Sequence, residues 1–160
     1  FGLIRARAIG VRAEKSKMRY SLQHFSHAHA GLVRGKASWR LAGASVARHA
    51  GTDRQAVAAF ARISALVPRI VQGEEKNEYL FDALAEAPGA LMRSHCEAWA
   101  TIELVCVARI LFALGYLSAE SVSATLFTHT AYAERELAEA QSQYDRLLSS
   151  INKAIAETQL

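Results

Sequence analysis

The first third of the chain alternates between apolar or small residues and polar residues with a period of two. Over residues 2–12 this alternation places Arg5 and Arg7 on one face and small residues on the other. A period of two is the pattern of a β-strand, whose successive side chains point to opposite faces. Two more strand-like runs, 25–33 and 37–47, are joined by a short connection that contains glycine, which is typical of a hairpin. We predict an antiparallel meander of three strands.

The later part of the chain repeats its apolar positions at the helical period of 3.6. Thr52 or Asp53 can cap a first helix, and Asn77 can cap a second. We expect Pro68 to kink or end the first helix, because proline lacks the N–H that a helix needs. Residues 88–89, a Pro-Gly pair, are expected to interrupt the second.

Two further helices are predicted beyond these. Ser94 and Glu97 fit a capping box before an apolar helix that ends at Gly115. A long amphipathic helix is expected over residues 132–157, with Leu148 among its inward positions.

This change of period near residue 50 predicts an α+β chain of two parts. A length of 160 residues suits one ordinary domain or two small ones. We assign residues 1–50 to a nucleic-acid-binding β domain and residues 51–160 to an all-helical domain. Leu111 and Leu114, just before the predicted helix end, are expected in the helical core.

Charge divides the chain at nearly the same place. Residues 1–48 hold ten lysines or arginines and one acid, Glu14, for a net charge of +9. Residues 49–160 hold nine basic and fourteen acidic residues, for a net charge of −5. Such asymmetry indicates a polyanion-binding N-terminal part, because dense positive charge attracts phosphate backbones.

Candidate nucleic-acid-binding residues follow from this charge. Residues i and i+2 on a strand lie about 6.7 Å apart, close to the phosphate repeat of an extended single strand, so Arg5 and Arg7 can track successive phosphates. The interleaved aromatics are candidate platforms for base stacking, although Phe25 and Trp39 equally fit a barrel core. The predicted DNA-binding residues are Arg5, Arg7, Arg12, Lys15, Lys17, Arg19, Arg34, Lys36 and Arg40, with Tyr20, Phe25 and Trp39 as stacking residues.

Other site chemistry is sparse in the sequence. Three histidines between residues 24 and 29 lack a local cysteine or carboxylate, so we predict no metal there. Cys96 and Cys106 are read as buried structural residues suited to a reducing cytoplasm. Glu74 and Glu75 are read as a solvated turn. No acid–base pair or nucleophile motif assembles, so we expect no enzyme and no cofactor.

Targeting and membrane segments are not expected either. The most apolar stretch, residues 98–117, is broken by Glu103 and Arg109. The basic opening differs from a mitochondrial presequence, because its first eleven residues alternate at the strand period.

Several short motifs, in this order along the chain, resemble the bacterial DNA repair protein RecO, a recombination mediator. They are residues 2–12 (GLIRARAIGVR), 16–23 (SKMRYSLQ), 32–36 (LVRGK), 39–41 (WRL), 71–81 (VQGEEKNEYLF), 109–117 (RILFALGYL) and 151–155 (INKAI), followed by 159–160 (QL). The resemblance implies an N-terminal OB-type β-barrel followed by a helical domain. It also implies that the barrel is truncated in this sequence, because family members have one more pair of strands before the position of Gly2. Many members carry a four-cysteine zinc site, which two cysteines cannot form.

The resemblance also implies a function. Such proteins are non-enzymatic, bind single- and double-stranded DNA, anneal complementary strands and engage the C-terminal tail of the single-strand-binding protein. With a RecR-type partner they help load recombinase onto coated gaps, in the cytoplasm and near the nucleoid. The basic residues support only DNA binding. An RNA-binding OB module of the translation apparatus and a helical interaction adaptor stay open as alternatives.

Overall fold

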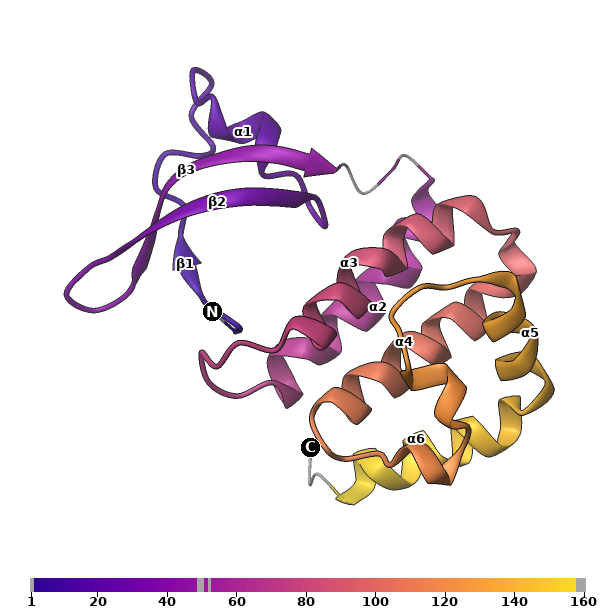
Figure 1. Ribbon diagram of the computed structural model, residues 1–160. Helices are drawn as coiled ribbons and strands as arrows, with labels where there is room; N and C mark the ends of the chain where they lie inside the picture. The colour runs from indigo at the N-terminus through magenta and orange to yellow at the C-terminus, as the bar shows by residue number, and fades with distance from the viewer. Residues whose placement is uncertain (1, 49–50, 52, 158–160) are drawn as a thin grey trace.

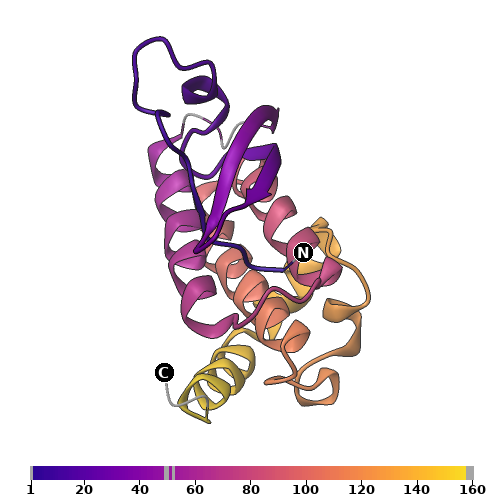
Figure 2. The ribbon, with the colours of Figure 1, turned by 90° about the vertical axis from the view of Figure 1, so that its left-hand side faces the viewer.

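A three-stranded sheet from the N-terminal part lies against one side of a group of helices (Figure 1). The computed structural model describes residues 2–48, 51 and 53–157. The fold class is α+β, as predicted. The strands are β1 (Ala6–Arg7), β2 (His27–Arg34) and β3 (Trp39–Arg48), and the helices are α1 (Met18–Ser21), α2 (Arg54–Ile70), α3 (Glu78–Arg93), α4 (Trp99–Ala113), α5 (Glu134–Ser142) and α6 (Tyr144–Glu157), with 3-10 turns at Cys96–Ala98, Ala119–Ser121 and Ala124–Phe127. The sheet lies beside α2 and α3, with α6 on the side of the helices away from it (Figure 1). In the turned view the strands stand in front of the helices (Figure 2).

The predicted hairpin is confirmed, but the predicted meander is wrong for its first strand. β2 and β3 pair antiparallel, whereas β1 pairs parallel with β3 at the other edge, in the order β1-β3-β2. β1 is short because the residues before it pack against the helices and the residues after it form a turn. Leu3 packs against the helical core, and Gly10 adopts a φ of 75° as a turn begins. The expected small inner face also fails, because Ala6 is exposed.

In the described residues the sheet has three strands and stays open, so no barrel closes. The stretch between β1 and β2 contains the short helix α1. A division into domains at residues 50 and 51 remains a prediction, because residues 49, 50 and 52 lie outside the described part.

Two predicted helix starts are confirmed. The Asp53 carboxylate accepts hydrogen bonds from the N–H groups of Gln55 and Ala56, and Asn77 Oδ1 accepts from Leu80 N–H. Thr52, the other candidate cap, lies outside the described residues.

The predicted interruption of the second helix at residues 88–89 is wrong, and the first helix does not end at Pro68. α2 runs through Pro68 to Ile70, and α3 runs through Pro88 to Arg93. Burial outweighs the lost hydrogen bond in α3, since Ala87 and Leu91 on either side of Pro88 are buried in the core.

The C-terminal predictions are corrected in three places. His95, not Ser94, precedes the turn that leads into α4, so the capping box does not form. The helix expected over 132–157 is two helices, α5 and α6, that meet at Gln143. Leu147 is fully buried, whereas Leu148 is 36% exposed. The expected stop at Gly115 is confirmed, because that glycine follows α4 with a φ of 78°.

α4 is the central helix of the helical part, and it packs against α2, α3, α5 and α6. Leu111 is fully buried on α4 as predicted, but Leu114 is only partly buried. No helix in the described ranges has both the length and the apolar character needed to cross a bilayer.

Arg109, in the C-terminal half of α4, is fully buried. Its guanidinium donates to the carbonyl oxygens of Leu126 (3.0 Å), Thr130 (2.8 Å) and Ala131 (2.8 Å), and lies 4.7 Å from the Tyr132 ring centroid. A buried charge is tolerated when its donors are satisfied in this way. Arg109 therefore fastens the segment before α5 to the central helix.

Candidate nucleic-acid interface

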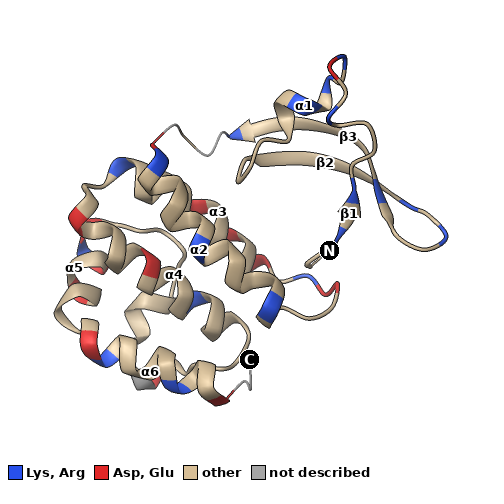
Figure 3. Cartoon of the chain, turned by 180° about the vertical axis from the view of Figure 1, so that it is seen from behind, with Lys and Arg blue, Asp and Glu red and all other residues tan. Residues whose placement is uncertain are grey.

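All nine predicted DNA-binding cations are exposed. They lie on β1 or directly before it, on the segment that includes α1, and around the β2–β3 hairpin tip, whereas most acidic residues lie on the helices (Figure 3). We call these nine residues the basic surface: Arg5, Arg7, Arg12, Lys15, Lys17, Arg19, Arg34, Lys36 and Arg40.

The basic surface carries little neutralising charge of its own. The ion pairs found among the described residues are Arg62–Glu103, Lys76–Glu78, His129–Glu136 and Lys153–Glu157, and none involves the basic surface. Exposed guanidinium and ammonium groups without a carboxylate partner keep their donors available to an external anion.

The sheet orders part of the basic surface into a row. Arg7 is the register partner of Arg40, and Arg40 is the register partner of Val33. Register partners point to the same face of a sheet, so these three exposed side chains lie side by side across the three strands.

The adjacent row, on the opposite face, is Ala6, Trp39 and Arg34. The Arg34 guanidinium lies 5.4 Å from the Trp39 ring centroid, and Trp39 Nε1 donates to Glu74 Oε1 at 2.8 Å. Arg34 and the turn before α3 therefore already occupy part of the predicted stacking platform at Trp39. Glu74, read from the sequence as solvated, is a structural partner of the sheet.

The other two predicted stacking residues differ from each other. Tyr20, at 68% exposed on α1, presents an open ring. Phe25 has a φ of 60° and packs edge-to-face on Phe60 of α2, with ring centroids 5.5 Å apart. Phe25 therefore joins the sheet to the helices instead of filling a barrel core.

Two of the three neighbouring histidines, His27 and His29, lie on β2. His27 and His29 have ring centroids 6.3 Å apart, and the His27 ring meets Phe81 of α3 edge-to-face at 5.5 Å. Across the described residues, no group of three histidine, cysteine or acidic side chains is arranged to hold a metal.

The two cysteines differ, which corrects one prediction. Cys106 is buried as expected, and burial raises the pKa of its thiol to about 11. Cys96 is exposed, because it lies in the 3-10 turn before α4 and not within the helix.

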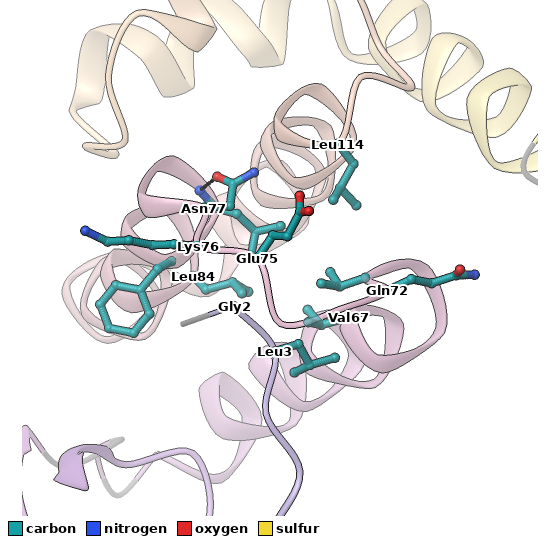
Figure 4. A pocket seen from close by; sticks show the side chains of 12 residues that line it. Gly2, Leu3, Val67, Gln72, Glu75, Lys76, Asn77, Leu84 and Leu114 are labelled. Atoms are coloured by element: carbon teal, nitrogen blue, oxygen red, sulfur yellow. Dashed lines mark hydrogen bonds between the residues drawn. The ribbon is translucent and has the colours of Figure 1, made fainter. Parts of the chain in front are cut away.

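An apolar pocket that no sequence pattern indicated lies between residues 2–3 and the helices (Figure 4). Leu3 lies beside Val67 there, with Leu84 and Leu114 on other sides. Gly2 N–H donates to the Glu74 carbonyl at 2.8 Å, and a Cβ at Gly2 would lie 2.0 Å from the Glu75 carbonyl oxygen. Only glycine fits this close approach. This contact joins residue 2 to residue 74, and a contact between positions so far apart produces no periodic pattern in the sequence.

Comparison with models of protein families, with curated proteins and with solved structures gives no match to this chain.

Proposed function

We propose that this chain is a non-enzymatic DNA-binding protein of the RecO type, a recombination mediator in DNA repair. The observation that carries the proposal is the basic surface: nine exposed cations, gathered on the sheet and α1, outside the ion pairs of the described residues. Such a surface suits a phosphate backbone, because each contact releases condensed counterions. The motif resemblance supplies the choice of DNA repair.

Under this proposal the open sheet belongs to an OB-type barrel. The antiparallel β2–β3 hairpin and the basic face beside it are compatible with that assignment. OB folds bind single strands with a positively charged groove and aromatic platforms. Tyr20 is the platform whose ring is most open to a base.

Strand annealing follows from the same surface. Two complementary strands repel each other through their phosphates, and a cationic surface that neutralises both lowers that repulsion. The proposed partners are single- and double-stranded DNA, the tail of the single-strand-binding protein and a RecR-type protein. The last two rest on the resemblance alone, as does recombinase loading onto coated gaps.

The decisive experiment pairs binding with annealing. Fluorescein-labelled (dT)20 is titrated at fixed salt, with unlabelled single-stranded DNA and a structured RNA hairpin as competitors. Annealing of two complementary 40-mers is followed by fluorescence quenching. We expect DNA to compete better than the hairpin, and annealing to accelerate with protein.

Two results would contradict the proposal in different ways. Stronger competition by the hairpin would favour the RNA-binding alternative. If neither nucleic acid binds, or if binding does not depend on salt, the proposed nucleic-acid interface is wrong. The helical interaction adaptor would then be the alternative that is left.

A further inference from the structure

Arg7 and Arg40 are directly opposite each other on neighbouring strands of the sheet. Neighbouring strands lie about 4.8 Å apart, so the two side chains project from the same face of the sheet at closely spaced positions. Both residues are exposed, and Val33, the next member of the row, is 56% exposed. The row is therefore open to solvent over its whole width.

Like charges directly opposite each other are unfavourable in a sheet. Sheets commonly relieve such a pair with a carboxylate, but no ion pair of the described residues includes Arg7 or Arg40. Glu74, in the turn before α3, bonds to Trp39, whose side chain is on the opposite face from Arg40. The repulsion is thus left for an external anion to offset.

We propose that Arg7 and Arg40 form a clamp for a single phosphate of a nucleic-acid backbone. A phosphodiester has two charged oxygens, and each can accept hydrogen bonds from one planar guanidinium. One bound phosphate would satisfy both arginines and remove their mutual repulsion. This inference rests on the proposed DNA-binding function and specifies its contact geometry.

The clamp also fixes how a strand crosses the sheet. Arg5 directly precedes β1, two residues before Arg7. An extended chain spans about 6.7 Å over two residues, which matches the step to the next phosphate. Arg40 is too close to Arg7 for such a step. The backbone therefore runs along β1, with Arg5 on one phosphate and the Arg7–Arg40 clamp on its neighbour.

Salt dependence distinguishes a shared phosphate from two separate ones. The slope of log affinity against log salt changes by about 0.7 for each phosphate contact on a single strand. The measurement is fluorescence anisotropy with fluorescein-labelled (dT)20 at four KCl concentrations. The variants are R7Q, R40Q and their double. A matched control pair is R12Q and K36Q, which are exposed cations on separate segments and not register partners.

We expect the R7Q/R40Q double variant to flatten the slope by about 0.7, and the R12Q/K36Q double variant by about 1.4. A loss near 1.4 for R7Q/R40Q would mean two separate phosphates and would overturn the clamp. An unchanged salt slope for R7Q/R40Q, together with the expected flattening of about 1.4 for R12Q/K36Q, would also overturn the clamp. That result would leave the DNA-binding function intact. Failure of the unmodified chain to bind (dT)20 would instead overturn the function and the clamp together.

A second arm identifies the source of the phosphate. An abasic 20-mer retains the backbone without bases, and we expect it to show the same loss of slope with R7Q/R40Q. If R7Q/R40Q flattens the salt slope with (dT)20 but not with the abasic 20-mer, the two arginines contact bases, and the clamp is wrong. Competition by inorganic phosphate at the same ionic strength should be weak, because a free ion lacks the neighbouring contact at Arg5. Equally strong competition would indicate a free-anion site and overturn the backbone assignment.

Discussion

The indole N–H of Trp39 donates to the carboxylate of Glu74, at 2.8 Å and across 35 residues of sequence. Gly2 N–H donates to the carbonyl of that same glutamate at 2.8 Å. One turn, between α2 and α3, thus holds two separate parts of the strand region. The sheet is therefore positioned against the helices by more than its chain connection.

Removing the Glu74 carboxylate should abolish the hydrogen bond that it accepts from the Trp39 indole N–H. In a W99F background Trp39 is the only tryptophan, since the chain has two. We expect E74A to shift Trp39 emission to the red and to cost about 0.5–1.5 kcal/mol, the usual net value of one hydrogen bond. E75A is the matched control, and an equal shift there would argue against a specific bond.

Charge reversal at Arg5 and Arg7 should weaken DNA binding for every sequence. Both side chains are exposed, so Glu at both positions should be tolerated by the fold. We expect the log–log salt slope to flatten by more than one unit, at about 0.7 per contact. Anisotropy titration at several salt concentrations checks this.

The comparison for that prediction is R135E/R146E on the helical part, where affinity should stay nearly unchanged. Equal losses from both pairs would place DNA elsewhere than on the basic surface.

Replacing Arg109 by Met should destabilise the helical part strongly. The carbonyls of Leu126, Thr130 and Ala131 would lose their donor. The buried Leu126 carbonyl, left unpaired, costs about 1–3 kcal/mol, and the bonds to the less buried Thr130 and Ala131 carbonyls contribute about 0.5–1.5 kcal/mol each. We therefore expect a loss of about 2 kcal/mol or more in urea unfolding. R62M removes an exposed ion pair with Glu103 and should cost at most about 1 kcal/mol. Similar losses in both variants would contradict the anchoring role.

Leucine truncations on and after α4 should differ. Leu111 is fully buried, so L111A should cost about 2–5 kcal/mol through the cavity it leaves. Leu114 is only partly buried, so L114A should cost less, below about 2 kcal/mol. Urea unfolding measures both, and a larger loss for L114A would reverse this ranking.

The two thiols should react at different rates. At pH 8 a chromogenic disulfide reagent should label exposed Cys96 quickly and buried Cys106 only after unfolding, because the thiolate is the reactive form. Burial raises the pKa of Cys106 from 9.0 to about 11. The folded state thus holds the proton more tightly, so stability should be complete below pH 9 and fall progressively between pH 9 and 11. C106A should lack the part of this loss that begins near pH 9, whereas burial also raises the pKa of Tyr132 and of Tyr79, which adds a separate loss above about pH 10 in both proteins. Fast labelling of both native thiols would contradict the burial of Cys106.

Local patterns predicted local structure well. The caps at Asp53 and Asn77 and the stop at Gly115 depend on a few neighbouring residues, and they are found where the sequence indicates. The exposure of the nine cations was also predictable, because charged side chains avoid burial without a partner.

Pairing between distant segments was not predictable. The parallel register of β1 with β3 and the Trp39–Glu74 bond depend on long-range contacts that leave no period in the sequence. The prolines misled for a related reason, since the burial around Pro88 outweighs its local cost. The apolar pocket at Leu3 was missed because its walls come from segments far apart along the chain.

The buried Arg109 also constrains the order in which the protein can mature during synthesis. Its three acceptor carbonyls lie 17 to 22 residues later in the chain. Until the ribosome has added them, the most apolar helix carries an unsatisfied charge that opposes its burial. The core therefore cannot close early on α2, α3 and α4 alone. Closure around Arg109 requires the segment 126–131, which is synthesised after α4 and before α5.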